Sequence, residues 1–179
     1  MQCSERKQSD TMRILGIDPG IAIVGYGIVD KEGNRYKTVA YDAVTTKAHT
    51  PLEDRLEKVY NGVCEIIKEY KPDAMSIEEL FFNNNAKTAL TVGQARGVII
   101  LAAVQNHIPV YEYTPLQVKQ ALTGYGRASK TQIQQMMKSM LGLTEVPKPD
   151  DVADALAIAV CHGNSMRFNS IKQFGGLIL

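Results

Sequence analysis

The sequence predicts one α/β domain, a mixed sheet of five strands with helices on both faces. Three apolar strands lie close together near the start of the chain and can form a meander, and helices and strands alternate after them. A length of 179 residues, with 45% hydrophobic and 22% charged residues, suits one globular domain with its own core. No apolar run is long enough to span a membrane, and the polar first residues carry no secretion signal.

Apolar and β-branched runs mark the strands. They predict strands at residues 13–18, 22–30, 36–44, 74–78 and 108–114. The polar segment "KEGN" forms a turn between the second and third strands. The chain order therefore predicts an antiparallel start to the sheet, followed by strands that reach their neighbours through helices.

Helical periodicity marks the remaining elements. It predicts helices at residues 51–70, 85–106, 115–122, 129–141 and 151–162. For the first helix we expect Thr50 as N-cap, Pro51 at the first position and Glu53 completing a capping box. For the last helix we expect Asp150 as N-cap.

The chain shows no repeat, linker or low-complexity tract, so we expect a single domain at residues 12–168. Residues 1–11 are expected to form a flexible N-terminal extension, and residues 169–179 a C-terminal tail. The three cysteines, Cys3, Cys64 and Cys161, are widely spaced and odd in number. This favours free thiols in a reducing cytoplasm over a disulfide or zinc framework.

Carboxylates end two of the apolar strands. Asp18 closes the first strand and Glu78 closes the fourth, and sites in open α/β sheets form at the carboxyl ends of strands. Asp151 and Asp154 are three positions apart, so they share one face at the start of the last helix. If the first and fourth strands are neighbours, all four acids converge.

Oxygen ligands without nitrogen or sulfur suit hard cations such as Mg²⁺ and Mn²⁺. Two such ions can activate a water and stabilise the leaving oxygen of a phosphodiester. The alternative is that each acid is a helix cap or a solvated strand end, which is favoured for Asp150 and competitive for Asp151. Because Asp18 and Glu78 both end apolar strands, a functional role is favoured for that pair.

A stretch without acids suggests a surface for a polyanion. No acidic residue occurs between Glu112 and Glu145, although the net charge of the chain is only +1. The basic residues of this stretch are Lys119, Arg127, Lys130 and Lys138. Charge alone does not separate a phosphate-facing surface from a solvated helix face.

Five motifs in order, "ILGIDPG" with "GYG", "SIEELFF", "NNNAKTALTVGQARGV", "PVYEYTPLQVKQALTGYGRASKTQI" and "DVADALAIAVCH", run from Met12 to Phe168. On these motifs the sequence resembles RuvC-type Holliday-junction resolvases, crossover junction endodeoxyribonucleases with an RNase H-like fold. The resemblance implies a homodimer that makes paired, symmetric nicks with Mg²⁺. By the same resemblance, the nicks leave 5′-phosphate and 3′-hydroxyl ends. The implied process is recombination and repair, and the implied partner is a branch-migration helicase complex.

The resemblance also implies roles for individual residues. Asp18, Glu78, Asp151 and Asp154 match the catalytic, metal-binding acids. Phe81 matches an aromatic residue at the junction centre, whereas Phe82 is expected to be buried. Lys119 and Lys130 match basic residues at the phosphates, and Arg127 is added by proximity. Small residues of the helix at 85–106 match the dimer interface, with tight packing on the sheet as the alternative: Ala89, Gly93 and Gly97.

Two other functions are open to such a chain. An ATP-dependent phosphotransferase of the actin and sugar-kinase type also begins with a strand ending in Asp-x-Gly. That class expects a second glycine-rich phosphate loop and usually a longer chain, and neither is found here. A non-catalytic junction-binding or RNA-processing relative would be expected to lack one or more of the four acids, and all four are present.

Overall fold

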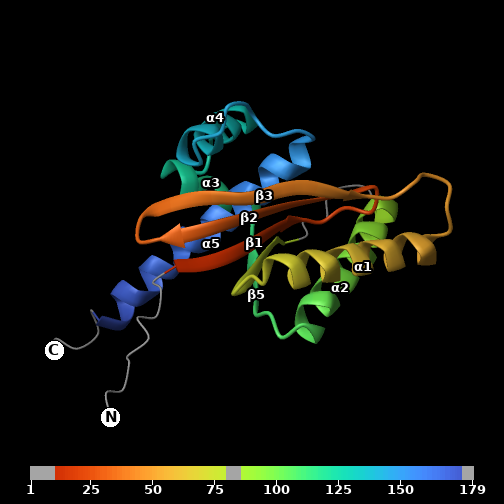
Figure 1. Cartoon of the computed structure of the whole chain (residues 1–179). Coiled ribbons are helices and arrows are strands. Elements are labelled where there is room, and N and C mark those ends of the chain that lie inside the picture. The colour runs from red at the N-terminus through yellow and green to blue at the C-terminus, as the bar shows by residue number, and fades with distance from the viewer. Residues whose placement is uncertain (1–10, 80–85, 175–179) are drawn as a thin grey trace, which may run out of the picture.

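The computed structural model describes residues 11–79 and 86–174. The strands are β1 (Thr11–Asp18), β2 (Ile23–Glu32), β3 (Arg35–Thr45), β4 (Ala74–Glu78) and β5 (Val110–Tyr113). The helices are α1 (Leu52–Tyr70), α2 (Ala86–Gln105), α3 (Pro115–Thr123), α4 (Lys130–Met140) and α5 (Asp150–Phe174). The predicted α/β class with five strands is confirmed (Figure 1).

The five strands form one mixed sheet in the order β3-β2-β1-β4-β5. The first three strands make an antiparallel meander, and β4 and β5 continue the sheet in parallel to β1. The predicted neighbourhood of β1 and β4 is confirmed, with Ile17 opposite Ile77 in the last pair of their ladder. Asp18 and Glu78 follow that pair, so both acids lie at one end of the sheet.

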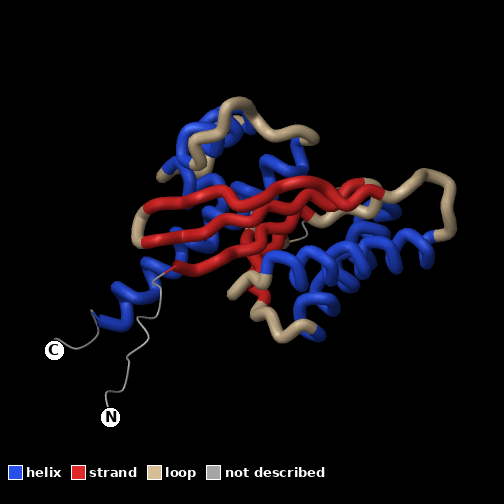
Figure 2. The backbone as a smooth tube through the Cα atoms, in the orientation of Figure 1, coloured by secondary structure: helices blue, strands red, loops and turns tan. Residues whose placement is uncertain are grey.

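Helices cover both faces of the sheet, as Figure 2 shows. Side chains alternate along β1, so Leu15 and Ile17 pack in a core with α1 and α2. Ile14 packs in a second core with α3, α4 and α5, and Gly16 faces α5. By the same alternation, Asp18 points toward the α5 side of the sheet.

Glycines let α5 lie directly on β1 and β2. A Cβ atom on Gly16 would lie 2.0 Å from the backbone oxygen of Ala155, and one on Gly25 would lie 2.1 Å from that of Asp151. No side chain fits at such distances, which explains why the first two strands carry glycine among apolar residues. The close approach brings the first turn of α5 to the end of the sheet where Asp18 lies.

Three local predictions differ from the structure. Pro51 has an extended backbone and itself occupies the N-cap position of α1, while the Thr50 hydroxyl donates to the Lys47 carbonyl at 2.8 Å. The predicted capping box of Thr50 and Glu53 is therefore wrong. The last helix does not end at 162 but continues to Phe174.

Both predicted terminal segments lie partly outside the described residues. Residues 1–10 lie outside the described residues, and Thr11 already belongs to β1. The tail at 169–179 stays a prediction, with its first residues still in α5. Cys64 and Cys161 are buried free thiols. No helix in the described part of the chain combines the length and apolar character needed to cross a membrane.

Candidate active site

The four predicted acids meet at the carboxyl end of β1 and β4. Asp18 and Glu78 end these strands, and Asp151 and Asp154 lie in the first turns of α5. Burial, and after it the charges of Glu78, Asp154 and Asp151, together raise the pKa of Asp18 to about 7. Burial and the charge of Asp154 likewise raise the pKa of Glu78. The acids therefore interact electrostatically at short range, as a shared site requires.

The cluster is open rather than closed around one point. Among residues 11–79 and 86–174, no three His, Cys, Asp or Glu side chains are arranged tightly enough to hold an ion as they stand. A cation sits among the acids instead, because the Lys130 ammonium lies 3.1 Å from Asp154 and 3.2 Å from Asp150. Carboxylates that repel one another in a partly desolvated place are a donor set that fits hard divalent cations.

A cavity of about 230 Å³ opens beside these acids, between β4 and helices α3, α4 and α5. Its polar lining consists of Glu78, Asp154, Lys119 and Lys130, and its other walls are apolar. Two carboxylates and two ammonium groups thus share one opening. This combination can bind a phosphate group next to carboxylate-held cations.

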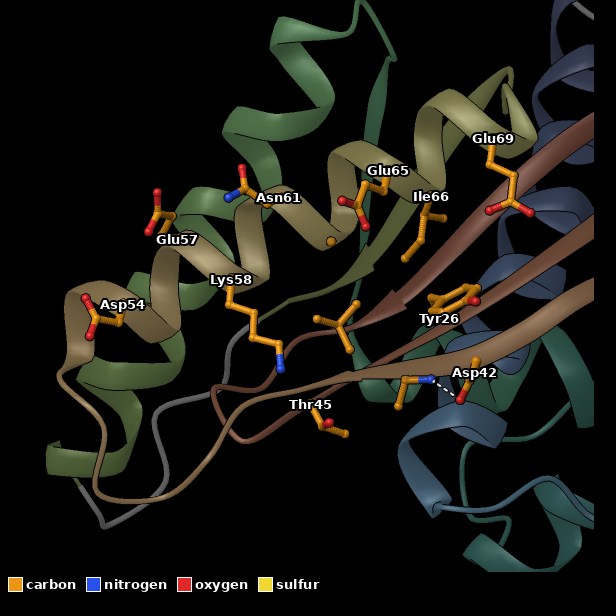
Figure 3. Close-up of a pocket in the computed structure, with 13 residues that line it drawn as sticks. Tyr26, Asp42, Thr45, Asp54, Glu57, Lys58, Asn61, Glu65, Ile66 and Glu69 are labelled. Atoms are coloured by element: carbon orange, nitrogen blue, oxygen red, sulfur yellow. Dashed lines mark hydrogen bonds between the residues drawn. The ribbon is translucent and has the colours of Figure 1, made fainter.

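A larger groove than this cavity lies elsewhere on the molecule. It has a volume of about 660 Å³ and runs between β3 and α1, where Figure 3 shows acidic side chains along the helix. Asp54, Glu57, Glu65 and Glu69 line it together with Asp42, and among the described residues that line it Lys58 alone is basic. This lining repels phosphate, so the groove is not the place for a DNA backbone.

The model of the family described as "Crossover junction endodeoxyribonuclease RuvC" matches residues 14–162 of this chain. The chain belongs to the RuvC family. Its resemblance to these endodeoxyribonucleases is thereby confirmed, and the phosphotransferase alternative is excluded. The RuvC family match covers every described acid of the site.

Individual relatives agree with this assignment. The chain is 62% identical to RuvC of Desulforamulus reducens over 167 residues, covering 93% of this chain and 99% of the relative. It is 59% identical to RuvC of Clostridioides difficile, covering 92% and 98% of the two chains. The solved structure of Thermus thermophilus RuvC superposes with a TM-score of 0.83 at 38% identity, covering 88% and 97%. The same RuvC, in complex with Holliday junction substrate, gives a TM-score of 0.84.

The basic residues predicted for this RuvC member differ in how close they lie to the acids. Lys119 and Lys130 line the acidic cavity, as above. Burial works against the charge of Lys130, but hydrogen bonds and charges of Asp154 and Asp150 outweigh it and raise its pKa. Arg127 is exposed in the loop before α4, and no contact ties it to the acids.

Two further predictions have distinct outcomes. Asp150 is the first residue of α5, and its carboxylate accepts a hydrogen bond from Gln134 Nε2 at 3.2 Å besides pairing with Lys130. The predicted N-cap role is therefore wrong, because the Asp150 side chain binds residues of α4. Phe81 and Phe82 lie outside the described residues.

Capping boxes that the sequence analysis missed hold the two lysine-bearing helices in place. Thr114 caps α3 with Gln117, and Ser129 caps α4 with Gln132, each pair exchanging two hydrogen bonds. The signals Thr-x-x-Gln and Ser-x-x-Gln were readable in the sequence. Lys130 directly follows the N-cap residue Ser129, so the capping box also fixes the backbone position from which the Lys130 side chain extends.

The raised pKa of Asp18 predicts that the metal-free protein loses stability as the pH rises from about 4 to about 7. Below pH 7 the folded protein keeps a proton on Asp18 that the unfolded chain releases near its ordinary pKa of about 4. The free energy of unfolding therefore falls by up to about 1.4 kcal/mol per pH unit in that window. Denaturant unfolding in EDTA at pH 5, 6 and 7 measures the slope.

The control for this pH prediction is Asp18→Asn. Burial lowers the pKa of His162 to about 4, which makes stability rise with pH up to about 6.5 and opposes the Asp18 slope. Since both proteins contain His162, the difference between their curves isolates Asp18. Parallel curves for wild type and variant would show that Asp18 titrates normally.

Proposed function

We propose that this protein resolves Holliday junctions as a homodimer that makes two symmetric nicks, in recombination and repair in the cytoplasm. The observation that carries the proposal is the cluster of Asp18, Glu78, Asp151 and Asp154 beside two lysines, in which burial and neighbouring carboxylates raise the pKa values of Asp18, Glu78 and Asp154. Membership of the RuvC family and the junction complex of the Thermus relative support four-way DNA as the substrate. A branch-migration helicase complex is the proposed further partner.

The four acids would hold two Mg²⁺ ions, with Mn²⁺ as a substitute, which supply an activated water and stabilise the leaving oxygen. The chain positions the DNA for that chemistry. Lys119 and Lys130 lie at the cavity shared with Glu78 and Asp154, so they bind the phosphate next to the carboxylates. Arg127 adds a backbone contact farther out, and Phe81 stacks on an unpaired base at the junction centre.

An exposed apolar stripe on α2 supports the dimer. Leu90, Leu101 and Val104 are 66%, 47% and 58% exposed, and Gly97 between them has no neighbour within 4 Å of a Cβ position. Their spacing of seven, four and three residues puts them on one helix face. Ala89 and Gly93 are half-buried beside this stripe. A second copy of α2 would cover these apolar side chains and give two active sites related by a dyad.

The test of the function is nicking of a mobile synthetic junction beside linear duplex of the same sequence, with Mg²⁺ and with EDTA. We expect paired, ligatable nicks in the junction alone, and only with Mg²⁺. Ligation of the products without end repair reports 5′-phosphate and 3′-hydroxyl ends. Tight junction binding without cutting in Mg²⁺ or Mn²⁺ would instead show that this protein is a non-catalytic junction-binding relative.

Leu101→Glu is expected to separate the dimer. The substitution would bury a charge from each copy at the dyad interface, so the dimer dissociation constant should rise at least a hundredfold, about 3 kcal/mol. Sedimentation equilibrium measures it, and the junction assay should show loss of paired nicks. Val39→Glu is the matched control, because Val39 is 37% exposed on β3, far from α2. A dimeric Leu101→Glu protein would place the interface elsewhere.

A further inference from the structure

Arg96 on α2 reaches the end of the sheet where Glu78 lies. Its Nε donates a hydrogen bond to the backbone carbonyl of Glu78 at 3.3 Å, and its Nη2 lies 2.5 Å from Glu112 Oε2. The Arg96 side chain is only 16% exposed, whereas Glu112 is 49% exposed. One guanidinium thus connects the helix to the ends of both β4 and β5.

The sheet holds the strand end at Glu78 from one side only. The β1–β4 ladder ends with Ile17 opposite Ile77, so both Glu78 and Asp18 extend one residue beyond it. Asp18 keeps Gly25 of β2 as its ladder partner on the other side. On the β5 side Glu78 pairs with Tyr113, next to the residue that Arg96 binds. Arg96 therefore holds the last residue of β4 where the sheet holds it from one side only.

We infer that Arg96 is a positioning residue for Glu78: it fixes the strand end that aims this carboxylate at the divalent cations. The inference rests on the proposed function, in which Glu78 is a metal ligand. Arg96 acts through the carbonyl of Glu78 and does not touch the DNA. Partners one step removed from a metal ligand set its orientation, and their loss weakens metal binding.

The guanidinium group is needed for this contact. Its planar fork donates a hydrogen bond from Nε while Nη2 forms the ion pair with Glu112, whereas a lysine ammonium is a single point of charge at the end of a flexible chain. Arg96→Lys keeps the charge beside Glu112 but loses the Nε donor to the Glu78 carbonyl. A purely electrostatic role would be rescued by lysine, and a positioning role would not.

The test compares Arg96→Met and Arg96→Lys with the same changes at Arg13. Arg13 binds the Asp30 carboxylate at 2.7 and 2.9 Å and the backbone carbonyl of Tyr70 at 2.9 Å, so it has the same kinds of partner at the opposite end of the sheet. The measurements are Mn²⁺ binding by electron paramagnetic resonance, junction binding in EDTA, and the Mg²⁺ concentration for half-maximal nicking.

We expect both Arg96 variants to bind Mn²⁺ about tenfold more weakly and to need about tenfold more Mg²⁺, with junction binding in EDTA unchanged. The Arg13 variants should bind Mn²⁺ like wild type. Glu112→Gln, which removes only the ionic anchor of Arg96, should weaken Mn²⁺ binding less, and it decides the matter if Arg96→Met does not fold. Wild-type Mn²⁺ affinity in Arg96→Met or in Glu112→Gln, or an equal loss in Arg13→Met, would overturn the inference.

Glu78→Gln separates this inference from the proposed function. If Glu78→Gln weakens Mn²⁺ binding and the Arg96 variants do not, only the positioning role fails. If Glu78→Gln itself binds Mn²⁺ and cuts like wild type, the proposed metal site is wrong, whatever the Arg96 variants show.

Discussion

Replacing Asp18 by asparagine should abolish junction cutting while junction binding in EDTA persists. The amide cannot supply the anionic oxygen that a hard cation needs, whereas Lys119 and Lys130 stay in place to bind phosphate. Changes one step removed from a metal ligand already cost 10–100-fold, so loss of the ligand itself should lower the nicking rate roughly a thousandfold or more. Single-turnover nicking and gel-shift titration measure the two effects separately.

Asp18→Asn should also be at least as stable as wild type in EDTA near neutral pH. The substitution removes a desolvated carboxylate that Glu78, Asp154 and Asp151 repel. Asp150→Asn is the matched control, because Asp150 is an exposed carboxylate next to Asp151 at the start of α5 but outside the proposed ligand set. It should keep cutting. A cutting-competent Asp18→Asn protein, or an inactive Asp150→Asn protein, would require a different ligand set.

Gly25→Ala should disturb the fold and the site together. The new Cβ would lie 2.1 Å from the backbone oxygen of Asp151 and 2.9 Å from the backbone nitrogen of Val152. Backbone atoms cannot rotate away, so the start of α5 has to move. Overpacking of this kind typically costs about 1–3 kcal/mol, and here it also displaces Asp151 from the other acids. We expect lower stability in urea unfolding together with loss of cutting.

Gly27→Ala provides the comparison for Gly25→Ala. Its Cβ would meet side-chain atoms of Leu156 at 2.6 and 2.7 Å, which can turn aside, and would come no closer than 3.1 Å to the backbone Cα of Leu156. Gly27→Ala should therefore destabilise less and keep measurable cutting. Equal stability of the two variants would show that the backbone of α5 does not pack directly against Gly25.

Local signals made much of the fold and of the site predictable. Alternation of apolar residues ended at Asp18 and at Glu78, and the three-residue spacing of Asp151 and Asp154 placed both on one helix face. The fold class needed only the order of these elements. These features depend on residues adjacent in sequence, which is why a single sequence carries them.

Contacts between distant residues were not predictable in the same way. Asp150 looks like a helix cap in sequence, but Lys130 and Gln134 of α4 capture its carboxylate. Thr50 looks like a cap too, yet the extended backbone of Pro51 takes that position. The sequence analysis assigned no role to Arg96, although it lies within a family motif, because only the fold brings it to Glu78.

The docking of α5 on β1 and β2 also bears on how the protein is made. All five strands are complete by Tyr113, but Asp151 and Asp154 follow only with α5, the last helix in chain order. Until α5 leaves the ribosome, a nascent chain holds two of its four acids and an uncovered apolar sheet face around Ile14 and Val29. The same helix that closes the core completes the carboxylate cluster. With the proposed ligand set, synthesis therefore yields a chain that becomes able to cut DNA only as its folding ends.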